Sequence, residues 1–228
     1  MKRINISIVF ILILFISCKR NVTNQSTETD NTLRFLPLEK LFVVGNFYGN
    51  GTIDTIFQHS YSLVSKTEID SVPDYFEEIE TYGMENWFKL HDWFREQEIK
   101  TFLTLKTDTL YFNLDYPSYG LFCLLNIGDV NNDGKDEIAF VVDWFDVSNL
   151  NRCEIYTICN HQWILLKEFQ IHENAFTYEG DIKLFTEIEG YLEKRDGKWF
   201  FLDFIEYMET DDDVMKPLKL SKCQDKNK

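Results

Sequence analysis

Short apolar segments separated by polar turns make up most of the chain from residue 34 onward. Segments of this kind, rich in β-branched and aromatic residues, are typical of antiparallel strands. Five pairs of segments, each joined by a turn-forming stretch, predict hairpins: 41–44 with 55–57, 101–105 with 109–114, 121–127 with 138–143, 154–159 with 163–169, and 191–194 with 199–204. We therefore expect a mainly β chain.

One stretch has helical periodicity instead. Trp87, Leu90 and Phe94 recur at the spacing of one helix face. This pattern predicts a single amphipathic helix near residues 84–97, inserted between two strands. Its aromatic face fits packing against the core better than a platform for a ligand.

The N-terminal residues carry an export pattern. Lys2 and Arg3 precede an apolar run over residues 4–16, which is shorter than the ~20 residues that a membrane-spanning helix needs. A positive start before a short apolar run is typical of a secretory signal peptide. A plain signal peptide cut nearby and an uncleaved anchor both fit this pattern.

Residues 14–18, Leu-Phe-Ile-Ser-Cys, resemble the lipobox of bacterial lipoproteins. The resemblance implies a lipoprotein signal peptide over residues 1–17, with Cys18 carrying fatty-acyl chains such as palmitate as the first mature residue. It also implies the bacterial cell envelope, as an outer-membrane lipoprotein that faces the periplasm or the exterior. Several acyl chains on one cysteine anchor a protein firmly, because each buried methylene contributes about 0.8 kcal/mol.

The mature chain divides further by composition. Residues 18–33 are polar, rich in Ser, Thr and Asn, and predict a flexible tether. Residues 34–210 hold the predicted strands and the helix as one β domain. Residues 211–228 are predicted to form a polar, solvated tail.

The net charge of the chain limits the classes of partner that it can bind. The 228 residues include 23 Lys and Arg against 38 Asp and Glu, a formal net charge of −15. Removal of residues 1–17 takes away Lys2 and Arg3, so that the net charge of the mature chain becomes −17. A chain this acidic, without a basic stripe, does not fit a nucleic-acid binder, which neutralises phosphates with clustered Lys and Arg.

The turn between the predicted strands 121–127 and 138–143 has the strongest chemical pattern in the chain. Oxygen-bearing side chains alternate with other residues, and Gly134 allows the sharp reversal between them. Calcium takes six to eight oxygen ligands, which alternate positions of a tight loop supply. The predicted ligands are Asp129, Asn131, Asp133, the carbonyl oxygen of Lys135, and Glu137. An apolar segment follows in place of a second helix, so the loop joins two strands and is not an EF-hand.

A glycine-aspartate calcium loop that leads directly into an apolar strand resembles the FG-GAP repeats of integrin-like β-propellers. The resemblance implies that Asp129, Asn131, Asp133 and Glu137 bind calcium and fasten adjacent strands of a blade. It also implies blade-like antiparallel sheets as the surrounding fold.

An upstream segment repeats the pattern. Residues 41–54 align without gaps on residues 124–137, an offset of 83. Asn46, Asn50 and Asp54 fall on ligand positions, with only one carboxylate among them. We expect this second loop to bind metal weakly or not at all, because Asn side chains that hydrogen-bond their own backbone also explain such a turn.

The number of loops limits the fold. Two loops are too few for a closed propeller, whose blades take roughly 40 to 60 residues each. The predicted fold class is therefore mainly β and antiparallel, a partial propeller-like or irregular β domain with two loop-bearing units and one inserted amphipathic helix.

Four cysteines remain beyond Cys18. For an exported protein, a bridge from Cys123 to Cys153 or Cys159 is the first expectation, with buried free thiols as the alternative. Cys153 and Cys159 lie about 20 Å apart along one predicted strand, too far to pair. The cysteines and histidines have no spacing typical of a zinc site, and the chain lacks a Gly-x-Ser-x-Gly elbow.

These features predict a lipid-anchored envelope protein with a calcium-stabilised loop and a binding or structural role toward an unknown protein or glycan. The alternative is an envelope hydrolase that acts on carbohydrate through dispersed carboxylates. A cleft with two or more acidic side chains away from the calcium loop would favour the hydrolase. A flat or merely aromatic surface would favour binding.

Overall fold

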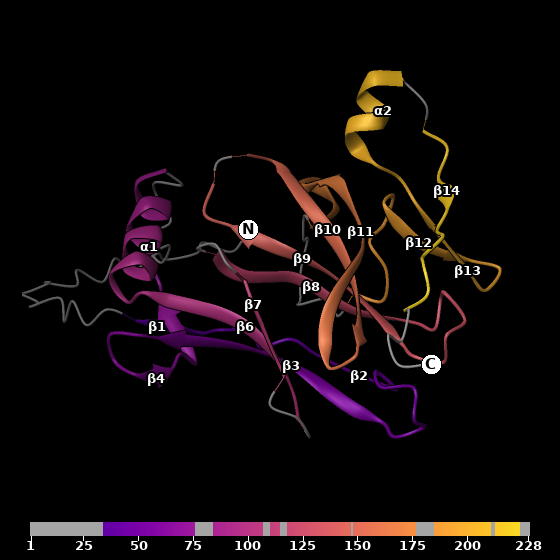
Figure 1. Cartoon of the computed structure of the whole chain (residues 1–228). Coiled ribbons are helices and arrows are strands. Elements are labelled where there is room, and N and C mark those ends of the chain that lie inside the picture. The colour runs from indigo at the N-terminus through magenta and orange to yellow at the C-terminus, as the bar shows by residue number, and fades with distance from the viewer. Residues whose placement is uncertain are drawn as a thin grey trace, which may run out of the picture. The chain divides into compact units, whose positions relative to one another are not determined.

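The computed structural model describes residues 34–75, 84–106, 110–114, 118–146, 148–176, 185–210 and 213–223. They belong to one compact unit, Leu33–Lys228. The expected signal peptide, Cys18 and the tether lie outside the described residues, so their roles stay predictions. Antiparallel strands dominate this unit (Figure 1), which confirms the predicted mainly β fold class.

A four-stranded antiparallel sheet forms the middle layer. Its strands, in chain order, are β8 (Ser118–Gly128), β9 (Glu137–Trp144), β10 (Leu150–Cys159) and β11 (Gln162–His172). The first six residues of β9 are all buried, because separate apolar cores cover the two faces of the sheet. This double burial explains the near-continuous apolar run that follows the predicted calcium loop.

A second sheet covers one face of the middle sheet. Its strands are β2 (Phe42–Gly45), β3 (Asp54–Ser62), β6 (Ile99–Leu105) and β7 (Tyr111–Asn113), with β4 (Thr67–Glu68) paired to β3. Ile56 and Leu103 pack with Phe140 and Ile158 of the middle sheet in one core. Each of these four side chains is at most 2% exposed, and burial of each contributes roughly 1.5 to 3 kcal/mol.

A smaller third sheet covers the other face. Its strands are β12 (Leu192–Arg195), β13 (Lys198–Phe201) and β14 (Lys216–Pro217). Trp199 packs in the same core as Ile155 and Ile171 of the middle sheet. Its indole Nε1–H donates to the carbonyl oxygen of Ile127 over 2.7 Å. The remaining short elements are β1 (Phe35–Pro37) paired with β5 (Ser71–Pro73), the 3-10 helix η1 (Glu173–Phe176) and α2 (Phe204–Thr210).

The predicted amphipathic helix is α1 (Met84–Glu96), which ends one residue before the expected end. Phe94 is 2% exposed, and its ring lies 5.1 Å from that of Tyr119 and 5.4 Å from that of Phe145, measured between centroids. The ring of Trp87 also lies 6.0 Å from that of Tyr119. The aromatic face of α1 therefore packs where β8 begins and β9 ends.

Each of the two larger sheets is a meander whose first hairpin carries one of the repeated loops. The pairing next to each loop joins a glycine to a carboxylate residue, Gly45 to Asp54 in β2–β3 and Gly128 to Glu137 in β8–β9. The inserted helix α1 falls between β3 and β6. This is the predicted organisation of two loop-bearing units. Within the described ranges no sheet closes into a barrel.

The β10–β11 turn is one residue shorter than expected. Cys159 pairs with Gln162, which leaves only Asn160 and His161 between the strands, with φ angles of 49° and 60°. A two-residue turn with positive φ at both positions matches the twist of paired strands. Gln162 therefore belongs to β11 and not to the turn.

The cysteine pairing corrects an expectation. Cys159 is bonded to Cys223, with 5.8 Å between the Cα atoms, and Cys123 and Cys153 are buried free thiols. The expected bridge from Cys123 is wrong because Cys123 and Cys153 both pair with Val141, on opposite sides of β9. Two strand spacings put their Cα atoms roughly 10 Å apart, beyond the ~7 Å limit for a disulfide.

The C-terminal segment also departs from the expected solvated tail. Met215 and Leu218 are each 8% exposed, and β14 pairs with β13. The disulfide at Cys223 then fixes the segment to the end of β10. The expectation of a solvated tail is wrong for this stretch because its apolar side chains Met215 and Leu218 lie between the charged ones and are buried. Residues 211–212 and 224–228 lie outside the described ranges.

Candidate functional site

The loop after β8 is held by side-chain to backbone hydrogen bonds. The carboxylate of Asp129 accepts the N–H of Asp133 on Oδ1 and the N–H of Gly134 on Oδ2, both over 2.9 Å. Asp133 in turn accepts the N–H of Lys135 over 3.0 Å. Gly134 has a φ of 91°, which a residue with a Cβ adopts only with strain. The Asp and Gly positions of the motif therefore fix the shape of the loop.

Three of the predicted ligands come together. The carboxylates of Asp129, Asp133 and Glu137 each offer an oxygen, and these oxygens all lie within 4.8 Å of one another. Two unit charges at this distance repel by about 3 kcal/mol at an effective dielectric of 20. Such a cluster gains stability from a bound cation or from protonation of one member.

Glu137 is the most unusual member of the cluster. Its side chain is 0% exposed. Oε2 accepts the N–H of Val130 over 2.8 Å, whereas Oε1 is buried with no hydrogen-bond partner. Burial raises the pKa of Glu137 to about 7, opposed by the Val130 hydrogen bond and reinforced by the charges of Asp133 and Asp129. An ion between the three carboxylates would supply the missing partner.

Two predicted ligands have structural contacts as well. Asn131 is buried, accepts the N–H of Asp133 on Oδ1 over 2.9 Å, and donates from Nδ2 to the carbonyl oxygen of Ser221 over 3.1 Å. The ammonium group of Lys135 lies 3.4 Å from Sγ of Cys223. Calcium ligation by the side chain of Asn131 and the carbonyl of Lys135 stays a prediction.

The C-terminal segment clamps the loop, which sequence reasoning missed. The N–H of Cys223 donates to Oδ2 of Asp133 over 3.2 Å. The ammonium group of Lys222 donates to the carbonyl oxygen of Asn132 over 2.6 Å. These partners lie 90 residues apart in the chain. Only an even cysteine count in an exported chain could have hinted at the link.

The upstream loop has the same turn but not the same charge. The N–H of Gly51 donates to Oδ1 of Asn46, and the N–H of Thr52 donates to Oδ1 of Asn50. These bonds match those of Gly134 and Lys135 at the offset of 83. No group of three carboxylates forms here in the described part of the chain. The side chains of Asn46 and Asn50 therefore bond to the backbone of their own turn. The expectation that Asn46, Asn50 and Asp54 bind metal weakly or not at all stays a prediction.

The two loops dock on each other. Asn46 donates its backbone N–H to Oδ2 of Asp136 over 2.8 Å and its side-chain amide to the carbonyl oxygen of Gly134 over 3.1 Å. Asn126 donates to the carbonyl oxygen of Val44 over 2.8 Å. The upstream loop therefore buttresses the carboxylate loop from one side, and the C-terminal segment holds it from another.

A separate cleft of about 1000 Å³ lies beneath α1 and is lined by β6 and β7 of the second sheet and by β9, β10 and β11 of the middle sheet. Glu154 of β10 and Glu168 of β11 line it and stand directly opposite each other in the strand pairing. The hydroxyl of Tyr156 donates to Glu154 over 2.9 Å, and Arg152 contacts Glu168 over 3.2 Å. Burial raises the pKa of Glu154. This cleft meets the condition set above for the hydrolase.

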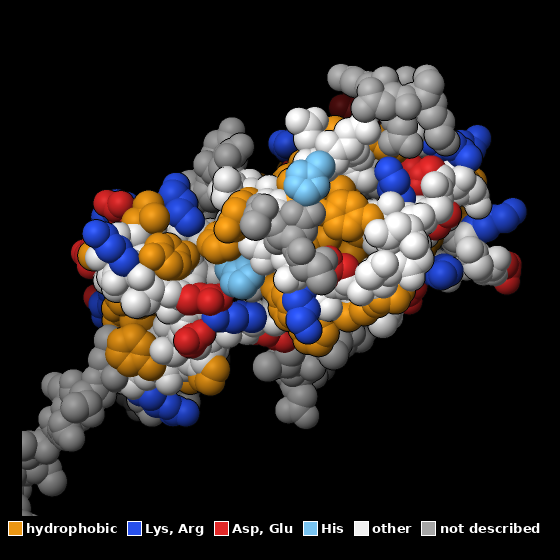
Figure 2. All heavy atoms as spheres, turned by 60° about the horizontal axis from the view of Figure 1, so that its bottom comes forward, with side chains coloured by type: hydrophobic (Ala, Val, Ile, Leu, Met, Phe, Trp, Pro, Cys, Tyr) orange, Lys and Arg blue, Asp and Glu red, His pale blue; other side chains and the backbone are white. Residues whose placement is uncertain are grey.

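The outer face of the second sheet carries a row of aromatic and imidazole rings. Successive ring centroids lie between 5.0 and 6.5 Å apart along Phe42, Phe57, His59, Phe102 and Tyr111. Phe42 and Tyr111 are each 59% exposed. Figure 2, which brings the lower side of Figure 1 forward, shows hydrophobic side chains interspersed with charged ones on this side.

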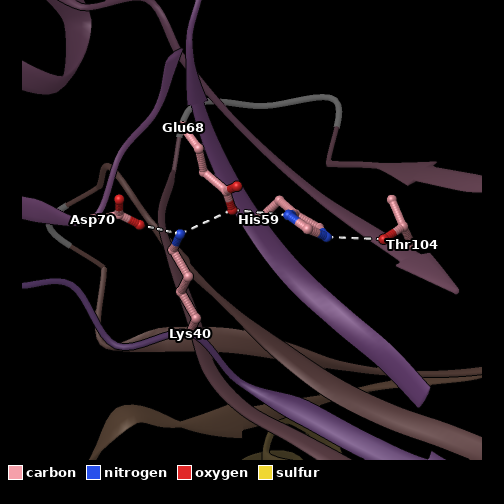
Figure 3. A network of polar contacts seen from close by, with 5 residues as sticks. All are labelled: Lys40, His59, Glu68, Asp70 and Thr104. Atoms are coloured by element: carbon pink, nitrogen blue, oxygen red, sulfur yellow. Dashed lines mark hydrogen bonds and ion pairs between the residues drawn. The ribbon is translucent and has the colours of Figure 1, made fainter. Parts of the chain in front are cut away.

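His59 also joins a polar network on that face (Figure 3). Its Nδ1 lies 2.8 Å from Glu68 and its Nε2 lies 2.9 Å from the hydroxyl of Thr104. Lys40 contacts both Glu68 and Asp70. Partial burial opposes ionisation of Glu68, but hydrogen bonds from Lys40 and His59 outweigh it and lower its pKa.

The order carboxylate, imidazole, hydroxyl in this network resembles a hydrolase triad in connectivity alone. Thr104 is the penultimate residue of β6, and neither His59 nor Thr104 lines the cleft beneath α1. We therefore interpret the network as a cross-strand link between β3, β4 and β6. Sequence reasoning missed it because the partners are 9 and 45 residues apart.

Among the described residues, no helix is both long enough and apolar enough to cross a membrane. A scan of protein-family models and searches of curated proteins and of solved structures gave no match to the chain.

Proposed function

We propose that the chain is a lipid-anchored protein of the bacterial cell envelope that binds calcium at residues 129–137 as a structural ion. Its role is that of a binding or structural module for a protein or glycan. One observation carries the calcium proposal: Glu137 is fully buried with an unpaired oxygen, in a cluster with Asp129 and Asp133. The motif that resembles FG-GAP loops, now placed between two paired strands, supports the same ion.

The chemistry of the donor set favours calcium over other metals. Every predicted ligand is an oxygen, which suits a hard cation, and no cysteine or histidine belongs to the cluster. Three carboxylates and a divalent ion together carry a net charge of −1, against −3 without the ion, in a partly buried loop. Extracellular calcium modules bind in the range of about 10⁻⁴ to 10⁻³ M, which fits a fastening ion in an exported protein.

Two features support the envelope location. The Cys159–Cys223 disulfide fits an oxidising compartment. Residues 14–18, which resemble a lipobox, predict export to the same compartment. For the binding role, the row of rings on the second sheet, in which Phe42 and Tyr111 are exposed, offers an apolar surface to a partner.

Calorimetric titration of the purified protein with calcium tests the metal site. We expect one site with a dissociation constant below about 1 mM, lost in the Asp129→Asn/Asp133→Asn double variant. Asp196→Asn is the matched control, because it also removes a carboxylate but lies in the β12–β13 turn, where Asn tolerates the φ of 50°. Absence of binding heat, or equal binding by the double variant, would refute the calcium proposal.

The envelope hydrolase is the second candidate, and the cleft with Glu154 and Glu168 is the observation that favours it. Glycosidases need one protonated and one ionised carboxyl group. Burial raises the pKa of Glu154 and so favours its protonated form, and the guanidinium group of Arg152 lies 3.2 Å from the carboxylate of Glu168. Release of reducing ends from cell-wall polysaccharide by the wild type, lost in both Glu154→Gln and Glu168→Gln, would support it. Absence of release leaves the binding role as the better account.

A further inference from the structure

A second cavity lies next to the large cleft and has a different chemistry. Its volume is about 420 Å³, within the ordinary range for a small-molecule site. It is lined where α1 meets the start of β8 and the end of β9. Phe94, Trp144 and Asp146 line both cavities and so form the boundary between them.

The charged side chains that line this second cavity are all negative. Four carboxylate side chains line it: Glu39, Asp143, Asp146 and Glu173. None of its described lining residues is Lys, Arg or His. The large cleft, by contrast, contains Arg95, Lys100 and Arg152 beside its acids. The smaller cavity therefore has a negative potential that no lining cation offsets.

Aromatic rings make up much of the remaining wall. Trp87 and Phe94 come from α1, Tyr119 from β8 and Trp144 from β9. Tyr119 meets the rings of Trp87 and Phe94 at 65° and 82°, so that these rings enclose a corner and do not stack flat. Cations are attracted to ring faces within about 6 Å, and carboxylates next to the rings strengthen this attraction.

Two lining side chains have hydrogen-bonding atoms left without a partner. Gln58 is 3% exposed, and its Oε1 is buried and unpaired. The hydroxyl of Tyr119 is also buried and unpaired. A Cβ on Gly120 would lie 2.8 Å from Nε2 of Gln58, so glycine at this position gives the amide its room. An unpaired buried acceptor that lines a cavity is available to a donor group bound there.

We propose that this cavity binds an organic cation, an alkylammonium or guanidinium group, with the charge among the four carboxylates and the N–H groups donated to Gln58. A bare metal ion would leave the rings without a role, and an anion would be repelled. The source is a free amine such as a polyamine, or a Lys or Arg side chain of a peptide. The cavity does not include residues 129–137, so this proposal does not depend on calcium binding there.

Asp143 gives the site a signature in pH. Burial, together with the charges of Glu173 and Asp146, raises the pKa of Asp143 to about 7. Burial and the charge of Asp143 raise the pKa of Tyr119, which therefore stays protonated. A cation favours ionised Asp143, so binding releases a proton at neutral pH and the affinity rises as the pH passes through 7.

Calorimetric titration tests the proposal, with calcium saturating throughout so that the loop is filled. The probes are agmatine, spermidine and an acetylated Ala-Lys-Ala amide, with sodium chloride at matched ionic strength as the blank. We expect saturable binding of at least one probe, with proton release that appears as a dependence of the heat on buffer ionisation. Binding of the amines alone indicates a free ligand, and binding of the peptide indicates a protein ligand; both support the organic cation.

Two variants locate the binding. Asp143→Asn and Trp87→Leu should each weaken the affinity by about tenfold, through the lost charge and the lost ring respectively. Glu209→Gln, an exposed change of the same charge on α2, should leave it within twofold. No saturable binding of any probe, unchanged affinity in both cavity variants, or an equal loss in Glu209→Gln would overturn the proposal.

Discussion

Reduction of the Cys159–Cys223 disulfide should both destabilise the fold and weaken calcium binding. The bond closes a loop of 64 residues. In the chain-entropy model this loop corresponds to a stabilisation of about 4 kcal/mol at 25 °C. The same bond also holds the segment whose Cys223 N–H and Ser221 carbonyl contact Asp133 and Asn131. The two effects therefore have one structural cause.

Urea unfolding of the wild type, with and without a reducing agent, measures the first effect. We expect the free energy of unfolding to fall by about 4 kcal/mol on reduction, and calcium affinity measured in parallel to fall at least threefold. The Cys159→Ser/Cys223→Ser variant is the control, because the reducing agent should not change it further. A fall below about 1 kcal/mol would refute the loop-closure argument, and an unchanged calcium affinity would refute the clamp.

Three further changes probe the core and the loop. Without calcium, Glu137→Gln should have a free energy of unfolding about 2 kcal/mol above that of the wild type at pH 8, but little above it at pH 5. The reason is that the pKa of Glu137 is about 7 in the folded state against 4.5 in the unfolded state, so the wild type loses stability as the pH rises through this window. Urea unfolding at both pH values checks this. Trp199→Phe should lower the free energy of unfolding by about 2 kcal/mol, because it leaves the buried carbonyl oxygen of Ile127 without its hydrogen bond. An unchanged denaturation midpoint would contradict this. Gly45→Ala should lower the free energy of unfolding by about 1 to 3 kcal/mol, because the added Cβ would lie 2.5 Å from Nδ2 of Asn126. Thermal melting tests this.

The local features of this fold could be predicted because each depends on neighbours in sequence. The hairpins follow from alternating segments around turn residues, and α1 follows from the spacing of Trp87 and Phe94. The turn shared by residues 45–54 and 128–137 also came from the sequence, since the side chains of Asn46 and Asp129 bond to backbone only five residues on.

Long-range features could not be predicted in the same way. The partner of Cys159 depended on where the C-terminal segment crosses the third sheet, which no local pattern of charged and apolar residues specifies. The two cavities beneath α1 gather Gln58, Asp143 and Glu154 from three different strands. Sequence spacing carries no information on such a meeting, because it depends on how separate sheets pack.

The contacts between the C-terminal segment and the carboxylate loop can form only late in the synthesis of the chain. Lys222 and Cys223 contact Asn132 and Asp133 across 90 residues of chain. At about 5 to 20 residues per second, the ribosome needs roughly 5 to 20 seconds to make the connecting stretch. During that interval the β8–β9 hairpin exists as a nascent segment without its C-terminal lock. A translation product that stops before residue 215 would therefore have the complete acidic motif but would lack the contacts that hold it in shape.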